Sequence, residues 1–457
     1  MEKVDNIIIG FGKAGKTLAT DLGNRGETTV LIERDPNMYG GTCINVACIP
    51  SKKLADLASK KPADVNNAKY YKESIQEKKD LISKLNHANY SNVQETDNVR
   101  VIDGEASFVN ENKVSVQLNS GGEVTYQADR IFINTGSTPN IPAIDGLEVD
   151  GQFIHTSKSL MDDEVFPEKL TIIGDGFIGL EFASIYRQFG SEVRVISDSP
   201  RDEFMKVADN EVAKAVLEAL EDMGIEFSFG TETTKISKKD SKIKLTYKHD
   251  GKTGEYESDK VLVATGRKPN VEHLNLEAAN IRLNENGSIQ INKHLETSTK
   301  NVYALGDVKG GPQHTYVSLD DYRIVVSRLF DDGSYNLSVR DYLPHVTFIN
   351  PPIAYIGLSE ELARANGYNV KVATLPVESI PKAKLLKSTT GVYKAIIDAD
   401  TDLILGTFLF GEESHEVINI ITTAMNADLT YKELANQIYT HPTMAEALND
   451  LFGNIDK

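Results

Sequence analysis

A six-residue pattern, Gly-x-Gly-x-x-Gly, occurs twice in this chain and strongly limits its possible folds. The first copy follows an apolar segment, Val4 to Ile9, and precedes a second, Thr29 to Ile32, which ends in an acid. Strand, glycine turn, helix and strand in this order form a βαβ unit whose glycines allow the backbone close to a pyrophosphate. The acid at the end of the second strand can bind a ribose hydroxyl. The predicted binding residues here are Gly10, Gly12, Gly15 and Glu33.

The second copy lies about 160 residues further along the chain. An apolar segment from Leu170 to Ile173 precedes it, a helical segment from Leu180 to Phe189 follows, and a strand from Glu192 to Ile196 completes the unit. Its predicted binding residues are Gly174, Gly176 and Gly179. Two such units predict an α/β fold with two Rossmann-like dinucleotide-binding domains.

The only two cysteines, Cys43 and Cys48, lie five residues apart just after the first unit. Five residues is a helical separation, so we expect both sulfurs on one face of a helix start. A helix N-terminus lowers a thiol pKa, which favours a redox-active dithiol. Two buried thiols or half a metal site are the alternatives, and we expect no metal because no further Cys or His lies nearby. A structural disulfide this short would constrain little chain entropy.

The charge of the chain excludes some partners. With 49 basic and 67 acidic residues the net charge is −18, which argues against nucleic acid and anionic membranes. The sequence has no basic-then-apolar leader and no apolar run of 18 residues. We therefore expect a cytoplasmic protein without membrane contact, in a compartment where a cysteine pair is more often catalytic than structural.

The remaining sequence indicates how the domains are arranged. Segments 131–140 and 262–270 are near-copies, each a strand that runs into a turn, and 301–307 is a strand that ends in Gly-Asp. From about 338 onward strands and helices mix without a third glycine pattern, which indicates an α+β domain. The predicted domains are 1–150 and 269–337 for the first nucleotide, 151–268 for the second, and 338–457 for dimerisation.

Together these motifs resemble the flavoprotein disulfide reductases, the family of glutathione reductase, dihydrolipoamide dehydrogenase and mercuric reductase. The resemblance runs nearly end to end and implies FAD on the first fingerprint, NAD(P)H on the second, and a homodimer. It also implies further cofactor-binding residues, namely Thr135, Gly136, Gly306, Asp307 and Thr315 for FAD, Phe177 where the nicotinamide stacks, and Thr42 and Gly266.

The same resemblance implies the catalytic roles. Cys43 is similar to the interchange thiol that meets the substrate, and Cys48 to the flavin-side thiol. Lys52, in the Cys-Ile-Pro-Ser-Lys pattern, would pair with Glu181 near the flavin. A further catalytic pair, His441 and Glu446, would act across the dimer interface. A carboxylate five residues after a histidine can orient the ring and make it more basic.

Within the family, segments 316–323 and 438–452 resemble the bacterial reactive-chlorine-resistance flavoproteins, including hypothiocyanous acid reductases. The chain lacks the extra C-terminal cysteines of mercuric reductases, and Tyr439 replaces the second histidine usual in dihydrolipoamide dehydrogenases. One departure is Ala47, where the family usually has glycine before the second cysteine.

These features predict that electrons pass from NAD(P)H through FAD and the cysteine pair to a small oxidant, with hypothiocyanous acid as the leading candidate. A reductase of small disulfides, a Cu(II) or Hg(II) reductase, a diaphorase or oxidase, and a redox-sensing flavoprotein are the alternatives. In the second unit, Ser197 takes the strand-end position that Glu33 has in the first unit. With Arg201 four residues further along the chain, this serine favours NADPH. Asp198 and Asp202 in the same loop keep NADH possible.

Overall fold

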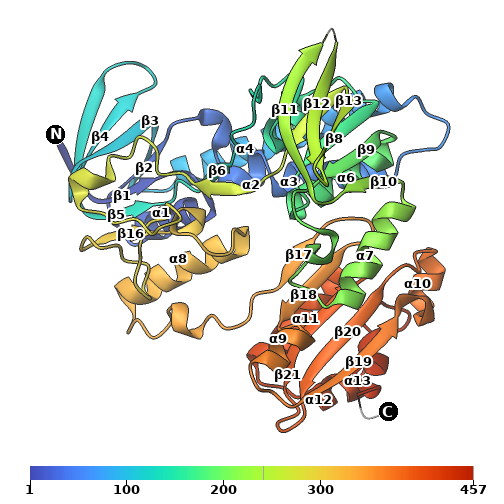
Figure 1. The fold of residues 1–457 in the computed structure, drawn as a ribbon. Helices are drawn as coiled ribbons and strands as arrows, with labels where there is room; N and C mark the ends of the chain where they lie inside the picture. Colours follow the sequence, from blue (N-terminus) through green and yellow to red (C-terminus); the bar gives the residue numbers. More distant parts are fainter. Residues whose placement is uncertain (240, 456–457) are drawn as a thin grey trace.

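The computed structural model describes residues 1–239 and 241–455 and has three sheet-based parts (Figure 1). The first part holds a six-stranded sheet in the order β1-β2-β3-β4-β5-β16. Its strands are β1 (Glu2–Ile9), β2 (Thr29–Glu33), β3 (Val99–Asn110), β4 (Lys113–Leu118), β5 (Glu123–Ile133) and β16 (Val302–Ala304). Its helices are α1 (Lys13–Asn24), α2 (Gly41–Asn45), α3 (Cys48–Ser59), α4 (Asn67–Gln94) and α8 (Thr315–Phe330).

The second part is a parallel five-stranded sheet in the order β10-β9-β8-β14-β7, joined by an antiparallel three-stranded sheet. Its strands are β7 (Ile154–His155), β8 (Lys169–Ile173), β9 (Glu192–Ile196), β10 (Ile225–Ser228), β11 (Thr231–Lys239), β12 (Lys242–His249), β13 (Lys252–Ser258) and β14 (Lys260–Val263). Its helices are α5 (Ser157–Asp162), α6 (Phe177–Phe189) and α7 (Asn210–Asp222). Two Rossmann-like sheets were predicted from the glycine patterns, and the α/β class is confirmed.

The third part, orange to red in Figure 1, is an antiparallel five-stranded sheet flanked by helices, as the predicted α+β class requires. Its strands are β17 (His345–Thr347), β18 (Ile353–Gly357), β19 (Val370–Pro376), β20 (Val392–Asp398) and β21 (Ile404–Phe410). Its helices are α9 (Glu360–Ala365), α10 (Pro381–Leu386), α11 (Ser414–Asn426), α12 (Tyr431–Asn436) and α13 (Ala447–Gly453).

The two near-copy segments have the same structural role in the first two parts. Gly10 has φ +102°, and a Cβ there would lie 2.4 Å from the carbonyl oxygen of Asn134. Gly174 has φ +108°, and a Cβ there would lie 2.6 Å from the carbonyl oxygen of Ala264. Each turn therefore packs so closely on the first fingerprint glycine that no side chain fits. The segments then pair with each other as β6 (Ser137–Pro139) and β15 (Arg267–Pro269).

The predicted single helix through both cysteines is wrong. Cys43 lies in α2, and Cys48 is the first residue of α3, with Val46 and Ala47 between the two helices. The cause is the backbone of Ala47, whose φ of −142° and ψ of −98° lie outside the helical region. Because this φ is negative, alanine can stand where the family usually has glycine without left-handed strain.

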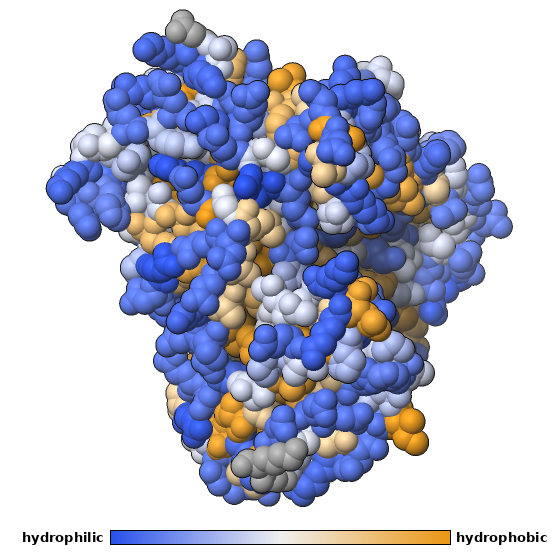
Figure 2. Space-filling view, turned by 90° about the vertical axis from the view of Figure 1, so that its right-hand side faces the viewer, coloured by the Kyte–Doolittle hydropathy of each residue, from blue (hydrophilic) through white to orange (hydrophobic). Residues whose placement is uncertain are grey.

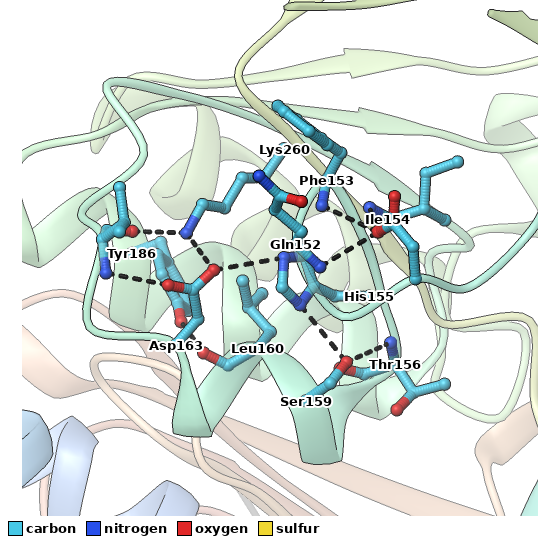
Figure 3. A network of polar contacts seen from close by, with 12 residues as sticks. Gln152, Phe153, Ile154, His155, Thr156, Ser159, Leu160, Asp163, Tyr186 and Lys260 are labelled. Atoms are coloured by element: carbon cyan, nitrogen blue, oxygen red, sulfur yellow. Dashed lines mark hydrogen bonds and ion pairs between the residues drawn. The ribbon is translucent and has the colours of Figure 1, made fainter. Parts of the chain in front are cut away.

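A buried polar network fixes α5 beside the nucleotide-binding regions (Figure 3). Lys260 of β14 donates to Asp163, and His155 lies between Asp163 and Ser159, at 3.4 and 3.2 Å from their oxygens. The side chains of Thr156 and Ser159 form a capping box at the start of α5. The network thus holds in place a helix whose first turn faces the cavity described below.

A second buried cation joins the second and third parts. Lys394 of β20 is 1% exposed and bonds Asp209 (3.0 Å), Glu360 (2.9 Å) and Glu211. Asp209 also accepts hydrogen bonds from the backbone N–H groups of Glu360 and Glu361. Since these carboxylates come from the region of α7 and from α9, the lysine ties the two sheets together.

We expect the Lys394→Met substitution to lower the free energy of unfolding by about 2 kcal/mol, because a buried hydrogen bond between charged groups is worth roughly 1.5–3 kcal/mol and only Asp209 is buried, whereas Glu211 and Glu360 are partly exposed and regain water. The effect stays modest because Asp209 keeps its backbone donors. Urea denaturation of the holoprotein measures it. Lys214→Met, which removes an exposed lysine of α7, is the control. Equal stability of the two variants would contradict the assigned role of Lys394.

One face of the molecule is mainly polar (Figure 2). Figure 2 shows hydrophilic side chains over most of one face, with apolar side chains in several separate patches. Among the described residues, no helix has the length and apolar character needed to cross a membrane.

Candidate active site

A cavity of about 940 Å³ brings together residues of all three parts. The first fingerprint, both cysteines and the start of α6 line it, and so do residues around β17. Most residues predicted for FAD binding and for catalysis lie along this cavity, namely Gly10, Gly12, Glu33, Thr42, Cys43, Cys48, Lys52, Thr135, Gly136, Phe177, Glu181, Gly306, Asp307 and Thr315.

The first fingerprint is held by side-chain hydrogen bonds. Glu33 accepts from the backbone N–H groups of Phe11 (3.0 Å) and Asp35 (3.1 Å), and burial raises its pKa. Asn134 accepts from the N–H of Gly15 at 2.9 Å. A Cβ on Gly12 would meet Asn134 at 2.4 Å, so the turn is packed against β5. The result is a cradle of fixed backbone at the cavity wall.

The two thiols interact directly. The Cys43 thiol donates a hydrogen bond to the Cys48 sulfur, which lowers the pKa of Cys48 to about 6 against the effect of burial. The same hydrogen bond and burial raise the pKa of Cys43. Thr315, at the start of α8, places its hydroxyl 3.6 Å from the Cys48 sulfur. In the reduced pair Cys48 is therefore the thiolate near neutral pH, and Cys43 carries the proton.

Lys52 and Glu181 form the predicted pair. The Lys52 ammonium lies 2.7 Å from Glu181, which is buried and also accepts from the backbone N–H of Phe348 at 3.0 Å. The ammonium lies 4.5 Å from the centre of the Phe348 ring. Phe177, half exposed at the start of α6, lines the same end of the cavity. This end therefore joins α3, α6 and the third part.

Asp307 and its turn are anchored from several sides. Asp307 accepts from the Ser137 hydroxyl at 2.6 Å, and Arg267 donates to the same hydroxyl at 2.8 Å. The N–H of Gly306 donates to Asp321 at 2.7 Å. Asp321 is fully buried and pairs with Lys309 and Arg340 at 3.2 and 2.7 Å. The segment 316–323 singled out in the sequence thus contains the carboxylate that fixes this turn.

The space beside the second fingerprint and beside the Gly266 turn is open, as a bound dinucleotide would require. A Cβ on Gly176 or on Gly266 would meet no atom within 4 Å, whereas one on Gly179 would meet the carbonyl oxygen of Gly174 at 2.1 Å. Arg201 lies outside the cavity lining, 2.9 Å from Glu221, with its guanidinium 5.6 Å from the centre of the Phe229 ring. The structure therefore does not bring Arg201 to the cavity.

His441 and Glu446 form a close pair away from the cysteines. The His441 Nδ1 atom lies 2.7 Å from Glu446, and the histidine side chain is 70% exposed. Neither residue lines the cavity among the described residues. Ile438, three residues earlier, is 91% exposed. Within one chain the pair therefore has no contact with the thiols.

Several residues of the site carried no recognised signal in the sequence. Asn134, Ser318 and Asp321 fix the first fingerprint and the Gly306 turn through single hydrogen bonds, and Ser318 accepts from the N–H of Ala14 at 3.3 Å. Arg267 lies in the cavity wall. The sequence could have indicated these residues only through their positions, because they lie in the near-copy segments 131–140 and 262–270 and in segment 316–323.

Two family models match the chain. The model of the pyridine nucleotide-disulphide oxidoreductases matches residues 4–321, and that of their dimerisation domain matches residues 343–452. The chain belongs to the pyridine nucleotide-disulphide oxidoreductase family. Members of this family are enzymes that bind FAD and use NAD(P)H.

Similar proteins span the whole chain. The probable pyridine nucleotide-disulfide oxidoreductase RclA of Escherichia coli K12 is 38% identical, with 99% of both chains covered. A mercuric reductase of Staphylococcus aureus is 33% identical over 97% of this chain and 81% of its own. A solved structure, the Cu(II) complex of the HOCl-induced flavoprotein disulfide reductase RclA from Escherichia coli, matches with a TM-score of 0.93, 38% identity and 99% coverage of both chains. This protein is a flavoprotein disulfide oxidoreductase of the same type.

The residues present fit the cofactor of the family. The cavity runs from the fingerprint glycines and Glu33 to the cysteine pair, and its wall at Gly136, where a Cβ would meet only the Thr42 hydroxyl at 4.0 Å, leaves room that a side chain would fill. When bound, a flavin supplies a two-electron carrier between a nicotinamide and a disulfide. No group of three or more His, Cys, Asp and Glu within the described residues is placed to hold a metal ion.

Proposed function

We propose that the protein uses NAD(P)H to reduce hypothiocyanous acid through Cys43 and Cys48. The observation that carries this proposal is the pair of Cys43 and Cys48 in the wall of the cavity, with the Thr315 hydroxyl 3.6 Å from the Cys48 sulfur. The chain has no third cysteine that would pass electrons on to a large substrate. A small oxidant that reacts at Cys43 itself fits this arrangement.

The reaction balances with the groups present. Cys43 first gives up its proton to a base. Its sulfur then attacks the sulfur of hypothiocyanous acid, and a sulfur–sulfur bond forms. The displaced hydroxide takes up one proton and leaves as water. Cys48 then attacks Cys43 and releases thiocyanate, which restores the disulfide. Overall a dithiol that carries one negative charge and hypothiocyanous acid give a disulfide, thiocyanate and water. The pair loses two electrons and the oxidant gains them.

The residues around the pair prepare it for this reaction. Thr315 and Lys52 favour the thiolate of Cys48, since a hydroxyl and an ammonium both lower its pKa. Glu181 holds Lys52 in place through the 2.7 Å contact. The proton of Cys43 needs a base, and we assign this role to His441 of a second copy of the chain, because in one chain its side chain is exposed and does not line the cavity that holds the thiols.

Steady-state consumption of NAD(P)H tests the substrate. The panel is hypothiocyanous acid, glutathione disulfide, lipoamide and Cu(II), which also covers the metal-ion alternative raised by the Cu(II) complex of the similar Escherichia coli protein. We expect the highest kcat/KM with hypothiocyanous acid. A higher value for any other member of the panel would overturn the substrate assignment.

We further propose that NADPH is preferred and that NADH is usable, with Arg201 as the residue that binds the 2′-phosphate. Arg201 is exposed and its partner Glu221 lies on the surface, so the side chain can leave that pair at little cost.

The Arg201→Ala substitution should raise the KM for NADPH by about three- to tenfold, because a charge-assisted hydrogen bond is lost and partly replaced by water. The KM for NADH should stay unchanged. Lys214→Ala, which removes an exposed cation of α7, is the control. A kcat/KM for NADH at or above that for NADPH would contradict the preference itself.

A further inference from the structure

Lys16 is an ammonium group without a carboxylate partner beside the redox pair. It lies in α1, half buried, and donates a hydrogen bond to the neutral side chain of Asn89. No ion pair of Lys16 occurs among the described residues. The fully buried lysines all have such partners, namely Lys78 with Asp162, Lys260 with Asp163, Lys309 with Asp321 and Lys394 with three carboxylates.

A stripe of asparagines on α4 places Lys16 and the redox helix next to each other. Asn89 holds Lys16, and Asn86, less than one turn earlier, donates to Asn45 at 3.0 Å. Asn45 ends α2, the helix that carries Cys43, and donates to the carbonyl oxygen of Gly41 at 2.9 Å. One face of α4 therefore fixes both the ammonium and the thiol-bearing helix.

The charges of this region act on each other. Lys16 acts to lower the pKa of Cys43, although the hydrogen bond to Cys48 and burial outweigh it. Burial and the neighbouring Lys13 lower the pKa of Lys16 to about 8, and Cys43 acts in the opposite direction. Lys13 itself lines the cavity. Lys16, which lies outside the cavity lining, thus adds positive charge near Cys43 in a chain whose net charge is −18.

A half-buried ammonium without a counter-charge is costly, and a small anion at this place would remove that cost. The net negative charge of the chain repels anions at long range, so an anionic reactant needs a local cation to reach Cys43. The position fits the thiocyanate group, which carries negative charge when it leaves.

We propose that Lys16 forms an anion subsite on the Cys43 side of the redox pair, which binds the anionic part of the oxidant and the leaving thiocyanate. The inference rests on the proposed function for its ligand, and it makes Lys16 a specificity-determining residue for small anionic oxidants over neutral ones.

Alkylation of the reduced holoenzyme tests the subsite without any oxidant. Iodoacetate is an anion and iodoacetamide is neutral, and both alkylate the same thiols. The ratio of their rates reports on local charge, because a change in thiolate fraction alters both rates equally. We expect Lys16→Met to lower the iodoacetate-to-iodoacetamide ratio about tenfold, equivalent to ~1.4 kcal/mol. Lys16→Arg should keep the ratio.

Lys69→Met, which removes an exposed lysine of α4, is the matched control and should leave the ratio unchanged. Thiocyanate should slow alkylation of the parent protein and of Lys16→Arg, and should protect Lys16→Met about tenfold less well. An unchanged ratio in Lys16→Met would overturn the subsite. Failure of hypothiocyanous acid as a substrate would instead overturn the proposed function and leave this measurement valid.

Discussion

Replacing Cys43 with serine will lower kcat for the best oxidant by about 10³-fold or more, because the attacking sulfur is lost and nucleophile removal has effects of this size or greater. Reduction of the bound flavin by NAD(P)H will continue, since the nicotinamide side of the cavity is unchanged. Stopped-flow measurement of flavin reduction and steady-state turnover separate the two steps. Retained turnover with the best oxidant would rule out the dithiol mechanism.

The same variant tests the origin of the Cys48 thiolate. In Cys43→Ser the only remaining thiol is Cys48, and the serine hydroxyl can still donate a hydrogen bond to it. We expect Cys48 to stay a thiolate above about pH 6 in this variant. In Cys43→Ala the donor is absent, so the pKa should rise and the thiolate should form only at higher pH. Ultraviolet absorbance of the thiolate against pH measures both.

The nucleotide-binding parts of the fold were largely predictable from the sequence, because glycine positions constrain the backbone. Gly10 and Gly174 have left-handed φ values that side chains avoid, so their spacing marks the strand-to-helix turns. The predicted strand Glu192 to Ile196 coincides with β9. The third part has no such turn, and strands such as β20 are buried on both faces, so only its mixed α+β class was predicted.

Other features depend on contacts that no local pattern contains. The break between α2 and α3 follows from the backbone of Ala47, a residue that favours helices. Lys52 and Glu181 were predicted as a pair from the family resemblance, and they are in contact. Asp321 and Lys16 were not recognised, because burial and the presence or absence of a partner arise only when distant segments pack together.

Replacing His441 with alanine will lower kcat for disulfide substrates by ~10²–10⁴-fold, the usual range for general acid–base assistance. Cys43 carries the proton of the reduced pair, so a base must remove it, and a leaving thiolate must gain a proton. Glu446 orients the ring through the 2.7 Å contact. The loss should be of similar size for hypothiocyanous acid, because Cys43 must still lose its proton and the oxygen that it displaces must gain one to leave as water.

Mixed dimers test whether His441 acts across the interface. A dimer of one Cys43→Ser chain and one His441→Ala chain has one site with both defects and one with neither, if each site combines the two chains. Mixed dimers form when both variants are refolded together. We expect each mixed dimer to have about half the activity of a parent dimer, whereas each variant alone stays inactive with disulfides. Glu446→Gln should reproduce part of the His441→Ala loss. Full activity in a monomer, measured by light scattering alongside turnover, would contradict the shared site.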